Sequence, residues 1–301
     1  YYAKNLYPNG APVVHAELPE GTTSIGGFAF YGCTGLESIK IPDSVTSIGY
    51  RAFEGCTGLT EIVIPDSVTK FDASVFNGCT NLKRVSLSNQ TTSIGNNSFA
   101  QCVSLESIII PEGVTYIGQQ AFRNCTALES IVIPDSVTSL DYYSFEGCIG
   151  LQKIVIGDGL TRLTSNYLDF TQLPALTEVV IGDGVTSVNY QQFKNLTSLK
   201  KVVLGNGITS IGNGAFSGCT ALESVTWGEN VTEIGENAFY SCSALKSVSD
   251  SNALVTIGNS AFYGCESLEN FPLSAQLTSI GNSAFSGCAK LTGVVLPDGL
   301  V

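Results

Sequence analysis

The sequence predicts a solenoid, in which short, strand-rich repeats stack on one another and share a continuous hydrophobic core. Two observations predict this fold. Phe recurs every 23 residues along almost the whole chain, with a single spacing of 25 between Phe145 and Phe170. Leu forms an unbroken column in the same register, from Leu36 to Leu291. Because one such repeat is too small to bury its own apolar face, stacked neighbours must complete the core.

Each repeat has a strand segment followed by turn residues. At residues 36–41 the motif Leu-x-x-Ile-x-Ile alternates apolar with polar positions, so that one face of the strand points inward. Pro42-Asp43-Ser44 is turn chemistry, and residues 45–48 are expected to form a second short strand. Ala52-Phe53 is expected to lie on one helical or 3₁₀ turn between glycines.

Leu-x-x-Ile-x-Ile is the strand motif of a leucine-rich repeat. The fold class predicted is therefore an α/β-type leucine-rich-repeat solenoid that is rich in strands. It should contain twelve 23-residue units, with a parallel sheet on the concave face and short strands or helical turns on the other faces.

The ends of the chain depart from the repeat. Val13, Ala16 and Leu18-Pro19 fall in the columns of the strand motif, so residues 1–18 are expected to form a degenerate N-terminal capping strand. Residues 19–301 are then the solenoid, with the 25-residue unit around residues 164–169. The chain stops inside a further repeat at 296–301, as expected of a piece of a longer protein.

Charge excludes several classes of function. The formal net charge is −12, from 26 acidic and 14 basic residues, and no basic cluster stands out. We therefore expect no nucleic-acid partner and no binding to anionic membranes. No apolar run is long enough to span a membrane, so no membrane insertion is expected within this segment. The sequence does not indicate an oligomeric state.

The repeats resemble the BspA-like leucine-rich repeats of cell-surface proteins, whose hallmark is Ile-Pro-x-x-Val-x-x-Ile-Gly-x-x-Ala-Phe-x-x-Cys-x-x-Leu. The match is clear from Ile64 through Cys79 and from Ile133 through Cys148, and it covers about residues 13–301. The departures are Gly157, Leu173, Gly182, Leu196 and Asp250. The resemblance implies an extracellular or cell-surface protein of host-associated bacteria or some protozoa, linked to adhesion. It carries over no catalytic residue.

Cysteine forms a third column, three residues after Phe, in ten of the twelve repeats. Stacked cysteines lie close enough for disulfides, but neither Cys-x-x-Cys pairs nor a neighbouring His suggests a metal site. We favour buried, inert thiols, since Leu173 and Leu196 replace Cys twice. His15 is the only histidine and lies in the capping strand, so no hydrolytic triad can be proposed. We predict no enzyme activity, no metal and no cofactor.

Two polar columns have alternative interpretations. Acidic residues follow the first strand, and they are either turn residues or ligands for cations such as Ca²⁺; turn residues are favoured. Threonine follows Val45 and its equivalents, and we favour cross-strand pairing over an ice-binding ladder. The acidic positions are Asp43, Asp66, Glu112, Asp135, Asp158, Asp183 and Asp298.

The outward face of the first strand is the best candidate for a binding surface. Four residues after the column Leu, five consecutive repeats carry Ile109, Val132, Val155, Val180 and Val203. Two residues after the same Leu lie Ser107, Ser130, Lys153, Glu178 and Lys201. A contiguous exposed apolar stripe marks a contact site, whereas β-branched residues also suit exposed strands without any function.

Two functions fit these observations. The first is a non-enzymatic protein-binding module of a cell-surface or secreted protein, which adheres to host or cell-surface macromolecules through the outward face of the sheet. The second is a passive spacer that displays other domains. The partner expected in the first case is a protein or another cell-surface macromolecule.

Overall fold

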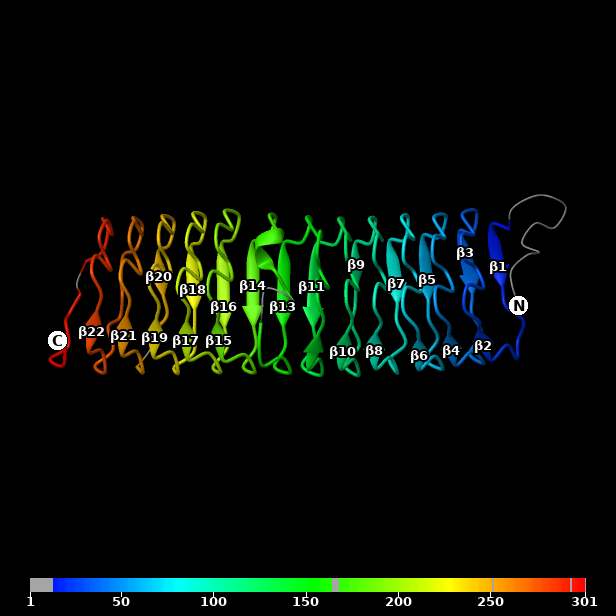
Figure 1. Cartoon of the computed structure of the whole chain (residues 1–301), viewed down its shortest axis with the longest axis horizontal. Coiled ribbons are helices and arrows are strands. Elements are labelled where there is room, and N and C mark those ends of the chain that lie inside the picture. The colour runs from blue at the N-terminus through cyan, green and yellow to red at the C-terminus, as the bar shows by residue number, and fades with distance from the viewer. Residues whose placement is uncertain (1–12, 164–167, 251, 293, 301) are drawn as a thin grey trace. The chain divides into compact units, whose positions relative to one another are not determined.

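The computed structural model describes residues 13–163, 168–250, 252–292 and 294–300. Its contacts divide the chain into two compact units. The first unit comprises the described residues up to Leu151 together with Leu168. The second unit comprises the described residues 152–163 and those from Asp169 onward. In each unit every repeat makes one turn of a parallel β-solenoid, so the predicted fold class is confirmed (Figure 1).

The first unit places two short strands in each repeat. The strands that follow the Leu column are β1 (His15–Glu17), β3 (Ser38–Lys40), β5 (Glu61–Val63), β7 (Arg84–Ser86), β9 (Ser107–Ile108) and β11 (Ser130–Ile133). The second strands are β2 (Ser24–Ile25), β4 (Ser47–Ile48), β6 (Lys70–Phe71), β8 (Ser93–Ile94), β10 (Tyr116–Ile117) and β12 (Ser139–Leu140). All recorded pairs are parallel and join equivalent positions 23 residues apart, such as Ala16 with Ile39.

The second unit has the same two columns of strands, although the described residues of its first and last repeats carry one strand each. Its first strands are β13 (Lys153–Ile156), β14 (Glu178–Ile181), β16 (Lys201–Leu204), β18 (Ser224–Thr226) and β20 (Ser247–Val248), which pair in this order. Its second strands are β15 (Ser187–Val188), β17 (Ser210–Ile211), β19 (Glu233–Ile234), β21 (Thr256–Ile257) and β22 (Ser279–Ile280). Lys153 pairs with Glu178 across 25 residues, so the longer repeat leaves the register intact. Four of the residues in which it is lengthened, 164–167, lie outside the described residues.

The core of each unit is a ladder of phenylalanines. Phe216 is completely buried between Phe193 and Phe239, with ring centroids 5.0 and 5.1 Å away and nearly parallel planes. The same stacking joins Phe30 to Phe145 through the first unit. The Leu column is also buried from Leu36 to Leu268. The register read from the sequence is therefore confirmed in both units.

The helical turns expected around Ala52-Phe53 are the part of the prediction that was wrong. Within the described residues, the only helix is the 3₁₀ helix η2 (Phe170–Gln172). Elsewhere the segment is a chain of tight turns. Arg51 has a left-handed φ of 55°, and Phe53 N donates to Val75 O in the next repeat at 2.9 Å. A helix cannot continue through a left-handed residue whose neighbours bond to another repeat.

The N-terminal segment continues the strand column. β1 pairs with β3 in the register of the repeat, and Leu18 N donates to Lys40 O at 3.1 Å. Residues 1–12 of the proposed capping strand lie outside the described residues. At the other end, residues 294–300 of the incomplete repeat are described and contain no strand.

Candidate functional site

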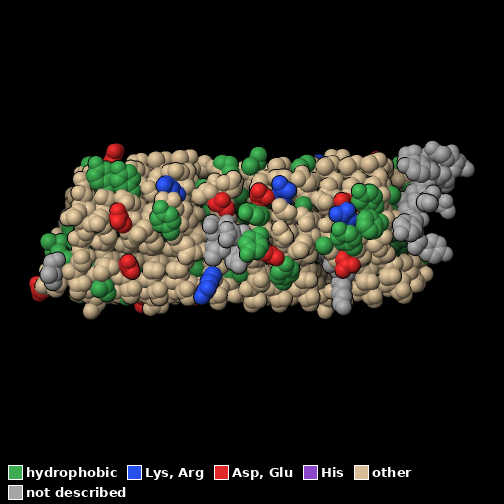
Figure 2. Space-filling model, in the orientation of Figure 1, with side chains coloured by type: hydrophobic (Ala, Val, Ile, Leu, Met, Phe, Trp, Pro, Cys, Tyr) green, Lys and Arg blue, Asp and Glu red, His purple; other side chains and the backbone are tan. Residues whose placement is uncertain are grey.

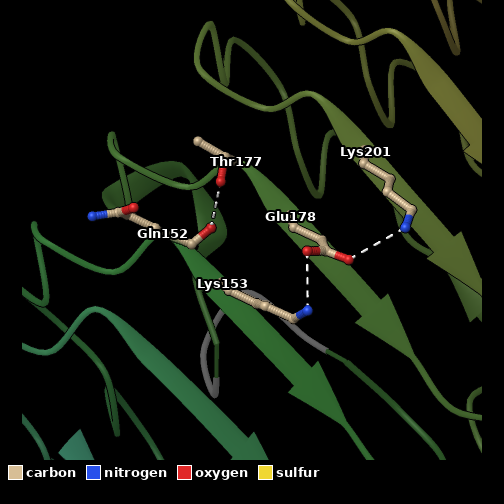
Figure 3. A network of polar contacts seen from close by, with 5 residues as sticks. All are labelled: Gln152, Lys153, Thr177, Glu178 and Lys201. Carbon is tan, nitrogen blue, oxygen red and sulfur yellow. Dashed lines mark hydrogen bonds and ion pairs between the residues drawn. The ribbon is translucent and has the colours of Figure 1, made fainter.

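In the second unit, the outward face of the first strands carries a polar row beside an apolar row. Glu178 lies between two lysines, with Lys153 Nζ 3.0 Å and Lys201 Nζ 3.5 Å from its carboxylate oxygens (Figure 3). Beside this row, Val180 of β14 pairs in register with Val155 of β13 and Val203 of β16. All three valines are half-buried, whereas their neighbours along each strand are buried in the core.

The two lysines beside Glu178 favour its ionised form. The hydrogen bond from Lys153, with the charges of Lys153 and Lys201, lowers the pKa of the Glu178 carboxyl. All three groups are accessible to water, so each pair contributes little to stability. The lysines nevertheless hold Glu178 ionised beside the valines, which gives the polar row a fixed charge pattern with a net charge of about +1.

In the first unit, the two apolar candidates are the more exposed ones. Ile109, just after β9, is 84% exposed, and Val132 in β11 is 57% exposed. β9 and β11 lie side by side, and Ser107 and Ser130 on the same two strands are also exposed. This pair of repeats therefore presents two large apolar side chains to solvent next to two hydroxyls.

The sequence analysis missed two members of the same column, Val63 and Val295, of which Val295 lies four residues after Leu291 and is 82% exposed. Val63 at the end of β5 is 66% exposed. Its spacing of four residues from Leu59 was the signal that could have found it. Ser86 of β7 pairs with Val63 and is polar, so the apolar column in this unit is interrupted.

The cysteine column has a role that the sequence did not reveal. Each thiol from Cys56 to Cys148 donates a hydrogen bond to the Phe carbonyl 26 residues earlier, at 3.0 to 3.1 Å between sulfur and oxygen. All ten cysteines are free thiols. Burial raises the pKa of the Cys56, Cys148 and Cys219 thiols to about 12. Such thiols are poor nucleophiles and poor metal ligands at neutral pH.

The acidic column consists of turn residues, and the carboxylates of Asp66, Asp158 and Asp183 accept backbone hydrogen bonds. Asp66 accepts from Asn89 N at 2.8 Å, and Asp183 accepts from Asn206 N at 2.7 Å, so each carboxylate ties its turn to the next repeat. In the part of the chain that the structure describes, no three His, Cys, Asp or Glu side chains group around a possible metal position.

The threonine column is also used within the fold. Thr46 Oγ1 donates to Thr23 O at 3.2 Å, and Thr232 Oγ1 donates to Thr209 O at 3.1 Å. These hydroxyls bond to the backbone of the preceding repeat rather than to the side chain of the neighbouring threonine. The column therefore stabilises the stacking of the second strands.

His15 forms a hydrogen bond that the sequence analysis did not anticipate. Its Nδ1 lies 2.8 Å from Ser38 Oγ on the outward face of β1 and β3. A catalytic Ser-His pair needs a third group that orients the imidazole. The nearby carboxylate of Glu17 is instead paired with Lys40, 2.6 Å away. This pair therefore has the geometry of a surface hydrogen bond.

The charged side chains on the face shown in Figure 2 are scattered over a surface of uncharged polar atoms. The lysines and arginines seen there form no continuous patch, in keeping with the net charge of −12. The described residues include no helix with the length and apolar character that crossing a membrane requires.

Comparison with known proteins places the chain in a family. The family model described as BspA type leucine rich repeat region (6 copies) matches residues 3–129, 92–220 and 166–292. A leucine-rich repeat protein from Bacteroides ovatus is 32% identical, with 92% of this chain and 85% of that chain covered and a TM-score of 0.56. A leucine rich cell surface protein from Faecalibacterium prausnitzii is 31% identical, with 95% of this chain and 80% of that chain covered and a TM-score of 0.51. A comparison with curated proteins found no match. The chain belongs to the BspA-type leucine-rich repeat proteins.

Proposed function

We propose that this chain is a non-enzymatic adhesion module that binds a protein or another macromolecule of a cell surface through the outward face of its first strands. The observation that carries the proposal is the exposure of Ile109 and Val132 in adjacent repeats. Large aliphatic side chains on an exposed strand are costly to leave in water, whereas Thr or Ser would satisfy the strand equally well. Covering such side chains gives a partner its binding free energy.

The second unit would offer a contact of its own, in which charges supply orientation. Val155, Val180 and Val203 are half-buried and lie beside the Lys153–Glu178–Lys201 row. Alternating charges select partners and fix their register more than they raise affinity. A solenoid supports both contributions, because its stacked core holds the strands in place and little conformational entropy is lost on binding.

The relatives support a location at the cell surface. The similar protein from F. prausnitzii is described as a cell surface protein, and we propose the same location for this chain. Adhesion requires no catalytic group, and the buried thiols and the Ser38-His15 hydrogen bond offer none. We therefore propose that the chain has no enzyme activity.

The test is binding of the purified chain to a panel of immobilised extracellular-matrix and cell-surface proteins, followed by surface variants. The double variant I109T/V132T and the triple variant V155T/V180T/V203T remove the apolar contacts of each unit while keeping β-branching. For a partner retained by the wild-type chain, we expect at least one variant to lower the affinity by about tenfold, or 1.4 kcal/mol. Unchanged affinity in both variants would exclude the outward face as the site.

Two further variants serve as matched controls. V255T makes the same substitution in the threonine column, away from the first strands, and should leave binding unchanged. T226V extends the apolar column of the second unit, since Thr226 pairs with Val203 and is exposed, and it should strengthen binding. A passive spacer, the alternative function, would retain no partner from the panel in any variant.

A further inference from the structure

A groove open to solvent crosses the turns that follow the second strands of the second unit. Its volume is about 400 Å³, within the range of roughly 300–1,000 Å³ typical of small-molecule sites. Asn213, Gly214 and Ser217 line it from one repeat, and the repeats on either side supply its walls. It lies on turns and not on the strands discussed above, so it is distinct from the proposed adhesion surface.

The groove exists because Gly214 interrupts a column of outward side chains. Gln191, Gly214 and Asn237 occupy equivalent positions in three successive repeats and share a left-handed backbone, with φ of 52°, 64° and 54°. A Cβ atom at Gly214 would lie 3.3 Å from Gln191 Cγ and 3.9 Å from Ser217 Cβ, both of which belong to groove residues. The missing side chain therefore leaves a space about one repeat wide, with walls roughly 10 Å apart from two strand spacings.

Tyrosines stand on both walls of the groove. Tyr190 on one wall is 70% exposed, an unusual exposure for an aromatic ring of this size. Tyr240 on the other wall is also exposed, and its ring stacks on Tyr263 of the next repeat at 5.0 Å between centroids and 6° between planes. The two walls thus offer flat apolar faces at the rim, one of them held in orientation by stacking.

Between these rings the lining is polar. Gln191, Asn213 and Asn237 supply amides, each of which has both donors and acceptors. Asn213 Oδ1 accepts from Glu236 N at 2.9 Å, which fixes that amide with its NH₂ group as the remaining donor. Lys194 and Glu236 add one charge of each sign, so the groove has no net charge. No aliphatic side chain lines it.

We propose that this groove binds a neutral pyranose oligosaccharide. A pyranose ring has an apolar C–H face, which stacks on an aromatic ring, and a rim of hydroxyls that both donate and accept hydrogen bonds. Exposed tyrosines together with a lining of amides and one charge of each sign match both properties. The absence of aliphatic lining disfavours an apolar ligand or a hydrophobic peptide side chain, and the balanced charge disfavours an anionic one.

The experiment measures binding of three named probes, maltotriose, cellotriose and triacetylchitotriose, by saturation-transfer-difference NMR and by titration of tyrosine fluorescence. We expect at least one trisaccharide to bind the wild-type chain and to receive saturation at its ring protons. The variant G214Q fills the groove with the side chain that Gln191 already places one repeat earlier. We expect it to weaken binding by about tenfold or more, and Y190A to do the same.

Controls separate groove filling from a general effect on the fold. S260Q places the same side chain on the same left-handed column outside the groove, because Ser260 has a φ of 52°. Y31A removes an exposed tyrosine from the first unit. Both should bind the trisaccharide as the wild type does, and all four variants should retain the wild-type circular dichroism spectrum.

The proposal is overturned if none of the three trisaccharides binds the wild-type chain. It is equally overturned if G214Q and Y190A, folded as judged by circular dichroism, bind as tightly as S260Q and Y31A. If G214Q does not fold, Y190A alone decides. Because this test uses neither the first-strand residues nor their protein partner, its result is independent of the proposed adhesion function.

Discussion

Removing one ring from the phenylalanine ladder tests most directly how much the stacked rings contribute to the stability of the core. Phe216 is completely buried, and both of its ring neighbours are themselves buried. Phe216→Ala removes a ring whose burial contributes about 2–3 kcal/mol to the free energy of unfolding. A cavity remains, because the stacked repeats fix the neighbouring rings on both sides. The total loss should therefore be about 3–5 kcal/mol in the free energy of unfolding.

The assay is urea denaturation followed by far-ultraviolet circular dichroism, with Phe285→Ala as the control. Phe285 occupies the same column near the end of the chain but is only half-buried, so its removal should cost clearly less. Repeat proteins can unfold in more than one step, so both variants should be compared in the transition that includes the second unit. A loss of less than about 1 kcal/mol for Phe216→Ala, or equal losses for the two variants, would refute the reasoning.

The remaining predictions concern the thiols and a close backbone approach. Burial raises the pKa of Cys219 from 9.0 to about 12, so the folded state keeps this proton after the unfolded state has released it. The resulting stability is complete below pH 9 and is lost as the pH rises toward 12, by up to about 1.4 kcal/mol per pH unit for each such thiol. Urea midpoints measured from pH 8 to 11 should fall, and less steeply in Cys219→Ala; parallel slopes would contradict this. In Gly207→Ala, the new Cβ would lie 1.9 Å from Asp183 O, so the thermal midpoint should drop by several degrees. Gly26→Ala has nothing within 4 Å and should change it little; equal effects of the two substitutions would show that the close approach does not matter.

The sequence predicted those parts of the fold that depend on repetition. The column Phe is buried from Phe30 to Phe262 and the column Leu from Leu36 to Leu268, since apolar periodicity reports directly which side chains face the core. Phe285 and Leu291, near the end of the chain, are only half-buried. Even across the 25-residue repeat the first strands keep their register, with Lys153 opposite Glu178.

The turns could not be predicted in the same way. Arg51 and Tyr143 have left-handed backbones, although neither residue type signals such a conformation. The hydrogen bonds of the surrounding repeats impose it, and these bonds are not local in sequence. The Cys thiol bonds were missed for a related reason, because Cys alone indicates only a small buried side chain.

The candidate surface was predictable only in outline. A spacing of four residues from the column Leu identifies the outward position, but exposure differs widely between Ile109 and the half-buried Val180. That difference depends on neighbouring side chains and strand twist. The groove at Gly214 was not predicted, because side chains from three successive repeats form it and no motif within one repeat signals it.

The column of left-handed turn residues varies in sequence, whereas the buried Phe column beneath it, which stabilises the fold, does not. At positions that are at least partly exposed the left-handed column carries Arg51, Gln120 and Tyr143 on the same backbone conformation, while the rings beneath remain Phe. A mutation there alters what a repeat displays without disturbing how it stacks. Duplication or exchange of whole repeats would therefore move a recognition element along the chain in a single genetic step. Transplanting residues 182–250, which include the groove floor and both of its walls, offers a direct engineering route to the same end.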